Sequence, residues 1–300
     1  MINSKNSLIR GVFLVGLGAT SYGMLATFVK LAYAEGFTTV EVTISQFVYG
    51  LLGLVLINVY NKLKASTRID QASSKNIFQL MLAGTSLGLT SVFYYLAIKY
   101  IPVSIAIILL MQTVWMGVLL EAILDRKLPS LQKSIAVVVV LFGTILATNL
   151  IDSRVELQWQ GLLLGMLSAA SFTTTMFTSN RVATNISSAQ RSLFMLLGGF
   201  LVIIAFSIYA FDGHFNFMIF MKWGIVVSLF GTIIPPMLFN AGFPKTGIGL
   251  GSIVASLELP VSVLMAYFLL HETVVLLQWI GILMIIMAIV IMNIDFKSKA

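Results

Sequence analysis

The stretch GIGLGSIVASLELPVSVLMAYFLLHET, residues 247–273, decides the fold of this chain. It is long enough for one helix across a bilayer, which needs roughly 20 apolar residues. Its small residues Gly247, Gly251 and Ala255 recur every four positions, a spacing that lets helices pack closely in lipid. Glu258 stands near its middle, two residues before Pro260. Because a carboxylate at mid-membrane faces protein or water and a proline kinks its helix, we expect this stretch to form an inner wall of a solute path.

The composition of the whole chain is that of a membrane protein. Of its 300 residues, 59% are hydrophobic and 10% are charged, whereas soluble domains have about 25% charged residues. The net charge of +7 comes from basic residues in the connections between apolar segments, so it predicts topology rather than a nucleic-acid partner. The chain has no cysteine, which excludes disulfides, thiol catalysis and cysteine-ligated metals.

Ten apolar segments predict an all-α integral membrane protein. They are too long and too uniformly apolar to be the strands of a membrane barrel. The first is interpreted as a retained span because no small-residue cleavage site follows it. The segments cover residues 9–33, 38–60, 77–99, 103–124, 131–151, 159–181, 188–211, 221–242, 247–270 and 275–294.

The distribution of basic residues predicts the orientation. The two termini and every second connection carry fourteen Lys and Arg residues, and the opposite connections carry only Lys30, Lys99, Arg154 and Lys222. By the positive-inside rule, we expect both termini in the cytoplasm. The membrane that the chain spans is expected to be the inner membrane of the cell. The connection 61–76 should then be cytoplasmic and 152–158 external.

The two halves of the chain show a weak internal repeat. A shift of 150 residues aligns Gly11, Leu14, Leu17, Ala19 and Ser21 with Gly161, Leu164, Leu167, Ala169 and Ser171, and a shift of 146 sets Gln112 opposite Glu258. Residues 1–151 and 152–300 would then be two repeats of five spans. An odd number of spans places such repeats inverted in the membrane, as in many transporters.

Several of these segments resemble a known family. SIVASLELPVSVLMAYFLLHETV (252–274) resembles the ending of EamA-type members of the drug/metabolite transporter superfamily, and GTIIPPMLFNAGFPKTG (231–247) resembles the helix and turn before it. YYLAIKYIPVSIAIILLMQ (94–112), with Pro102, is the equivalent part of the first half. The resemblance covers the whole chain and implies a transporter of ten helices. The chain departs from the family pattern at three places. Val114 or Trp115 stands near the position of the family's proline in the fourth span, Arg126 stands where Leu-x-Glu is usual, and Gln46 stands where an arginine is common.

Glu258 is the sharpest candidate for a functional residue. It is interpreted either as a substrate-facing, protonatable group in a central cavity or as a carboxyl that closes the backbone gap left by Pro260. No Lys or Arg of the sequence falls near its depth. The carboxyl should therefore be neutral when its surroundings are dry and ionised when water reaches it, which would let it carry a proton in exchange for substrate.

The other candidate binding residues are polar or aromatic side chains within predicted spans. Gln112 and Trp115 share one helix face and could orient and stack a solute, or could instead hold two helices together. Asn240 follows the double proline Pro235–Pro236 and could satisfy freed carbonyls or face solute. Weaker candidates are Tyr22, Gln46, Tyr94 and Tyr95, and Ser171 and Thr173–Thr175 are expected to allow bending.

Together these features predict a secondary transporter, an exporter or exchanger of small organic metabolites that works by alternating access. Its cavity would lie between the halves, against the first, third, fourth, sixth, eighth and ninth spans. The resemblance implies amino acids as the substrate class. The alternative is a non-transporting structural or lipid-handling subunit of a membrane complex. A G-x-x-x-x-G-K-[ST] motif and a catalytic constellation are both missing from the sequence, so we expect no ATPase, enzyme or cofactor.

The expected partners are a small-molecule metabolite, the lipid bilayer and protons, with the chain a monomer or a homodimer. We expect no metal site, because His271 and Glu272 form no zinc motif. Glu121 is expected to pair with Arg126 or Lys127 at a helix end.

Overall fold

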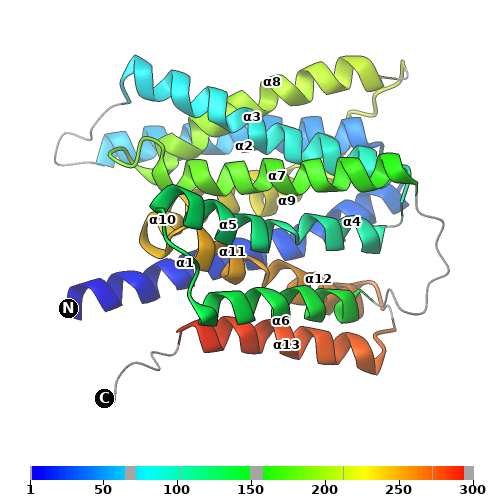
Figure 1. Ribbon diagram of the computed structural model, residues 1–300. Helices are drawn as coiled ribbons and strands as arrows, with labels where there is room; N and C mark the ends of the chain where they lie inside the picture. Colours follow the sequence, from blue (N-terminus) through cyan, green and yellow to red (C-terminus); the bar gives the residue numbers. More distant parts are fainter. Residues whose placement is uncertain are drawn as a thin grey trace, which may run out of the picture.

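The computed structural model describes residues 2–64, 72–101, 103–148, 158–211, 213–271 and 273–293. This part of the chain is a bundle of helices without strands (Figure 1). Pro102, Glu272 and much of the connections 61–76 and 152–158 lie outside the described residues. The all-α membrane class predicted from the sequence is confirmed.

Eight helices of the described residues are long and apolar enough to cross a membrane, and two shorter apolar helices accompany them. The first half contains α1 (Ile2–Ala34), α2 (Thr39–Lys64), α3 (Ser74–Ala97), α4 (Val103–Leu110), α5 (Thr113–Asp125) and α6 (Leu131–Ala147). The second half contains α7 (Trp159–Arg181), α8 (Ser188–Ala210), η2 (Phe220–Gly224), α9 (Ile225–Ser228), η3 (Leu229–Ile233), α10 (Ile234–Thr246), α11 (Ile248–Ala255), α12 (Glu258–Leu269) and α13 (Leu276–Asn293). The segments η2 and η3 are π-helical turns within one continuous span.

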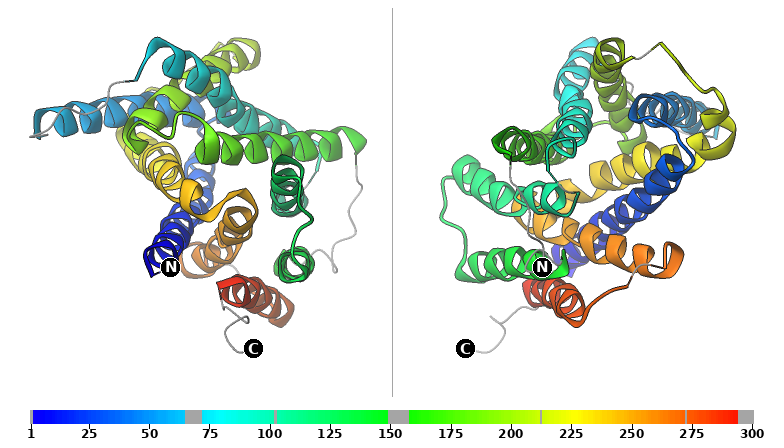
Figure 2. Two further views of the ribbon diagram at one scale, coloured as in Figure 1. Left: turned by 60° about the vertical axis from the view of Figure 1, so that its left-hand side comes forward. Right: turned by 90° about the vertical axis from the view of Figure 1, so that its right-hand side faces the viewer.

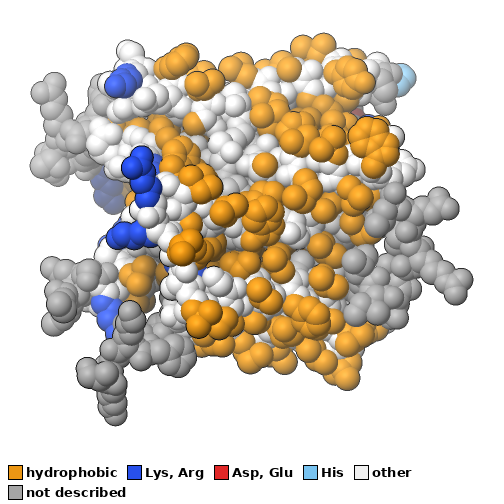
Figure 3. Space-filling view, in the orientation of Figure 1, with side chains coloured by type: hydrophobic (Ala, Val, Ile, Leu, Met, Phe, Trp, Pro, Cys, Tyr) orange, Lys and Arg blue, Asp and Glu red, His pale blue; other side chains and the backbone are white. Residues whose placement is uncertain are grey.

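Serine caps begin three of the helices at the end of the bundle that holds the termini. Ser73, Ser130 and Ser187 each accept a hydrogen bond from the backbone N–H three residues later, which satisfies a donor that the first helical turn leaves free. On the face seen in Figure 3, apolar side chains cover the middle and Lys and Arg side chains gather near the termini. This distribution agrees with the bias of basic residues along the sequence.

The same pairs of spans are in contact in the two halves. The helix α1 packs on α10 and on both parts of the ninth span, α11 and α12, and α7 packs on α3 and on both parts of the fourth span, α4 and α5, while α6 pairs with α13 and α5 crosses α11. Figure 2 shows α6 and α13 side by side at one margin of the bundle. The closest crossing joins α3 and α8, where a Cβ at Gly198 would collide with the carbonyl of Met81.

Two of the predicted spans are broken at equivalent places. The ninth span divides into α11 and α12 immediately before Glu258, and the fourth divides into α4 and α5 at Met111 and Gln112. The sequence predicted a kink beside Pro260, and the structure has a two-residue turn there, Ser256 and Leu257, between α11 and α12. The fourth span breaks without a proline, so the departure at Val114 does not remove this feature from the first half.

Two expectations about residues near the helix ends are wrong. Gly247 does not lie on a helix face, because it forms the turn between α10 and α11 with a φ of 77°. Glu121 does not pair with Arg126 or Lys127. It forms an ion pair with Lys133 of α6 and accepts a hydrogen bond from the backbone N–H of Gly249 at 3.2 Å.

Candidate functional site

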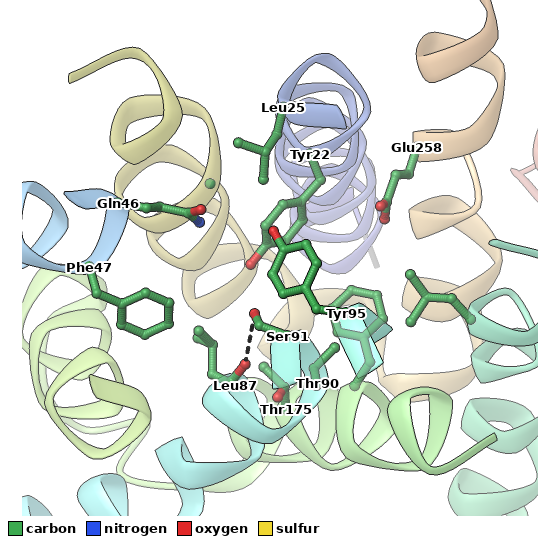
Figure 4. Close-up of a pocket in the computed structure, with 13 residues that line it drawn as sticks. Tyr22, Leu25, Gln46, Phe47, Leu87, Thr90, Ser91, Tyr95, Thr175 and Glu258 are labelled. Atoms are coloured by element: carbon green, nitrogen blue, oxygen red, sulfur yellow. Dashed lines mark hydrogen bonds between the residues drawn. The ribbon is translucent and has the colours of Figure 1, made fainter. Parts of the chain in front are cut away.

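A cavity of about 90 Å³ lies in the middle of the bundle. Residues from both halves of the chain enclose it: α1, α2 and α3 contribute one side, and α7, η3 and α12 contribute the other (Figure 4). The residues that line it are Tyr22, Leu25, Gln46, Phe47, Leu87, Thr90, Ser91, Tyr95, Leu110, Phe172, Thr175, Gly231 and Glu258.

Three polar side chains from three helices converge on this cavity. Tyr22 comes from α1, Gln46 from α2 and Glu258 from the first turn of α12, and Figure 4 shows all three pointing toward the same space. Within the described residues, no hydrogen bond from the protein reaches the Tyr22 hydroxyl, the Gln46 side-chain amide or the Glu258 carboxyl. Because buried polar groups are nearly always hydrogen-bonded, these groups are available to a solute or to water.

The surrounding elements hold these side chains in place. The ring of Tyr22 packs against Phe172 and Phe239, with ring centroids 6.1 and 5.6 Å apart. The amide of Gln46, a residue only 6% exposed, lies against Gly231 in the π-helical segment η3, where a Cβ would meet its nitrogen. The break before α12 places Glu258 at a helix start.

The remaining polar groups of the cavity are hydroxyls whose protons are already used. Thr90 donates to the carbonyl of Ser86 at 2.8 Å, and Ser91 donates to that of Leu87 at 3.5 Å, the bond drawn in Figure 4. Thr175 donates to the carbonyl of Ser171 at 3.3 Å or shares a hydrogen with Ser86 at 2.8 Å. These oxygens therefore offer lone pairs to the cavity. The lining contains a carboxyl group and no Lys, Arg or His.

Tyr22, Gln46, Glu258 and Tyr95 are the sequence candidates that line the cavity, and the others lie outside its lining. Tyr94 is the neighbour of Tyr95 on α3, with the two rings 6.0 Å apart. The sequence analysis passed over Thr90, Ser91 and Leu87. A signal was present, because Leu87, Ser91 and Tyr95 recur every four residues and so share one face of a helix.

Gln112 and Trp115 bond to each other and to their own helix. At the break between α4 and α5, the backbone N–H of Gln112 donates to the carbonyl of Leu109 and not to that of Ile108. The side-chain amide of Gln112 donates to the carbonyl of Ile108 in its place, at 3.0 Å. The indole N–H of Trp115 donates to the Gln112 amide oxygen at 2.8 Å. The pair therefore braces the broken helix.

Asn240 belongs to a buried polar cluster built around Arg191. Arg191 is one of the fourteen basic residues attributed above to the termini and connections, but it lies in the first turn of α8 and is 1% exposed. Its guanidinium donates to the carbonyls of Asn240 at 2.6 Å, Ser179 at 2.7 Å, and Thr178 and Val182 at 3.0 Å. The Asn240 amide donates to the Ser192 hydroxyl at 2.9 Å. This cluster ties α7, α8 and α10 together.

Ion pairs join the helices at both ends of the bundle. Asp125 pairs with Arg181 near the termini, and at the opposite end Lys222 pairs with Glu35 at 2.8 Å. The hydrogen bond from Lys222 lowers the pKa of the Glu35 carboxyl. The described residues contain no cluster of three His, Cys, Asp or Glu side chains that could hold a metal ion.

Comparison with known proteins identifies the family. The chain is similar over 92% of its length to a solved structure described only as "Crystal structure of protein", with 13% sequence identity, 96% coverage of that chain and a TM-score of 0.73. At this identity the likeness shows the fold alone. No curated protein matches the chain. The sequence model of the EamA-like transporter family matches residues 9–149 and 159–294, which together take in both halves. The chain therefore belongs to the EamA-like transporter family.

Proposed function

We propose that the chain is a secondary transporter that moves a small organic solute through the central cavity by alternating access. The proposed architecture is ten spans in two inverted repeats, residues 1–151 and 152–300, with both termini on the cytoplasmic side of a cell's inner membrane. Three observations support this architecture: the chain belongs to a transporter family, the fourth and ninth spans are interrupted at equivalent places, and corresponding spans of the two halves make the same contacts.

One observation carries the proposed binding site. Tyr22, Gln46 and Glu258 meet at a cavity enclosed by both repeats, and their polar groups lack protein partners within the described residues. Solute sites combine apolar walls with a few convergent polar groups of this kind. We expect the two repeats to rock about this cavity of about 90 Å³ as they admit and release the solute.

The chemistry of the lining favours a solute with an ammonium group. The cavity presents the Glu258 carboxyl, hydroxyl lone pairs and the aromatic faces of Tyr22 and Phe172, without a basic side chain. Carboxylates and aromatic faces both attract an amine cation. Amino acids carry this group, and they are also the class that the family resemblance implies.

Glu258 is the proposed proton carrier. An ionised carboxylate without a cation is costly at mid-membrane, and no basic residue of the described chain pairs with it. The carboxyl therefore holds either a proton or the ammonium group of a solute. Alternation between these two occupants would drive export of the solute against entry of a proton.

The test is transport by the purified chain in liposomes, with a panel of radiolabelled amino acids. The wild type is expected to accumulate at least one of them when a proton gradient is imposed. Glu258→Gln keeps the shape of the neutral carboxyl and removes its titration, so the variant should lose proton-driven accumulation and retain solute exchange.

Glu35→Gln is the matched control, because Glu35 lies outside the cavity at a bundle end. It should accumulate solute as the wild type does. Full accumulation by Glu258→Gln would refute proton carriage by this residue. An absence of flux with every amino acid would favour the alternative, a structural or lipid-handling subunit.

A further inference from the structure

A second cavity lies at the end of the bundle opposite the termini. Its volume is about 160 Å³, and the start of α2 and the ends of α3 and α8 enclose it. We call it the vestibule; it is lined by Thr38, Thr39, Val40, Tyr95, Lys99, Phe206 and Ala210. Tyr95 is the residue that lines both this cavity and the central one.

The polar groups of the vestibule are hydrogen-bond donors. The ammonium group of Lys99 is exposed and has no partner within the described residues. The Thr38 hydroxyl accepts from the backbone N–H of Glu41 at 3.3 Å, and the Thr39 hydroxyl accepts from Tyr33 at 3.2 Å. Each threonine therefore keeps its own hydrogen to donate. The serine and threonine hydroxyls of the central cavity do the reverse and present lone pairs.

Two carboxylates of the described residues near this end are occupied elsewhere. Glu41 accepts from the backbone N–H groups of Thr38 at 2.6 Å and Asn216 at 2.5 Å, and Glu35 pairs with Lys222. Neither lines the vestibule. Among the described residues that line this cavity, Lys99 is charged and none is acidic.

Tyr95 is held where the two cavities meet. Its ring packs edge-on against that of Tyr94, with centroids 6.0 Å apart, and Tyr33 of α1 donates to the Thr39 hydroxyl at 3.2 Å on the vestibule side. Figure 4 shows the Tyr95 ring in front of Tyr22 at the edge of the central cavity. Tyr95 is therefore placed to separate the two cavities.

We propose that the vestibule is a second solute-binding site, which takes the carboxylate end of an amino-acid-like solute on Lys99 and the hydroxyls of Thr38 and Thr39, and that Tyr95 separates it from the central site. The solute class rests on the proposed function. A zwitterion would meet a carboxyl group in the central cavity and an ammonium group in the vestibule, so each of its ends has a complementary site along one path.

The test uses chemical modification, because the chain has no native cysteine. Ala210→Cys places a thiol in the vestibule, and its reaction rate is measured in the purified protein with a sulfonate-bearing and a trimethylammonium-bearing thiosulfonate reagent. The ratio of anionic to cationic rates should fall about tenfold when Lys99→Gln is added. The ratio should stay unchanged when Lys222→Gln is added instead, because the Lys222 ammonium group already has a carboxylate partner. Equal ratios in all three proteins would overturn the anionic site.

Protection of the same thiol tests binding of the solute's carboxylate. A mixture of neutral L-amino acids should slow the reaction, the matching amino-acid amides should not, and Lys99→Gln should abolish the protection. Protection by the amides as well, or by neither mixture, would contradict a carboxylate site. The readout needs no flux, so a failure here is distinct from a failure of the transport assay.

A thiol deeper in the path tests the role of Tyr95. Ser91 lies one turn from Tyr95 on α3 and lines only the central cavity. With Tyr95 present, Ser91→Cys should react at least tenfold more slowly than Ala210→Cys, and Tyr95→Ala should remove most of that difference. A difference that persists in Tyr95→Ala would assign the separation to other residues.

Discussion

At the scale of single residues, two glutamines that both fall near the middle of a predicted span have different roles in the structure. Gln46 turns an unpaired amide to the central cavity, against the space left by Gly231. Gln112 spends both ends of its amide on the break between α4 and α5. The hydrogen bonds, rather than the residue type, therefore decide which of the two can meet a solute.

The two Gln→Ala substitutions make a matched pair. We expect Gln46→Ala to raise KM for the transported solute about tenfold, the loss of one hydrogen bond worth about 1.4 kcal/mol, with little change in thermal stability. Gln112→Ala leaves the carbonyl of Ile108 and the indole of Trp115 without partners, so it should lower stability by about 1–3 kcal/mol. Thermal denaturation in detergent and concentration-dependent uptake check both. The reverse pattern would place Gln112 in the binding site.

At the scale of helices, Arg191 joins three of them, although the sequence pattern gave it no role beyond the bias of basic residues. The lengths of the apolar segments predict the spans, and Pro260 predicts the interruption of the ninth span. The interruption at Met111 could not be predicted, because no proline stands there. The apolar pattern also could not find Arg191, because the acceptors are backbone carbonyls of α7, α10 and the turn before α8, which have no signature in side chains.

Glu258 and Gln46 could be found, since an isolated polar residue stands out in an apolar span. The hydroxyls of Thr90 and Ser91 could not, since many hydroxyls in spans bond only to their own helix.

Arg191→Lys tests this junction. A lysine cannot reproduce the planar fork of donors that serves four carbonyls, so the variant should lose at least about 2 kcal/mol of stability. Arg181→Lys, at a more exposed ion pair, should lose less than about 1 kcal/mol. Thermal denaturation of the two proteins in one detergent compares them. Equal losses would mean that the carbonyl contacts of Arg191 contribute little.

At the scale of the whole molecule, the gathering of basic side chains near the termini predicts which end faces the cytoplasm (Figure 3). With no cysteine in the chain, single cysteines report their own side of the membrane. Lys62→Cys, in the final turn of α2, should resist a membrane-impermeant maleimide in intact cells. His214→Cys, between α8 and η2, should react. Labelling of the first and not the second would reverse the orientation and move the vestibule to the cytoplasmic face.

The pairing of α6 with α13 has a consequence for the lipid around the protein. The helix α6 has 17 residues between its caps Ser130 and Thr148. At about 1.5 Å per residue it reaches about 26 Å, less than the roughly 30 Å of a hydrocarbon core. Because α6 lies with α13 at one margin of the bundle (Figure 2), its shortness falls on a single flank. Acyl chains beside that flank would compress to match it, and compression costs energy for every ångström of mismatch. We therefore expect the bilayer to be thinner along this flank than around the rest of the protein.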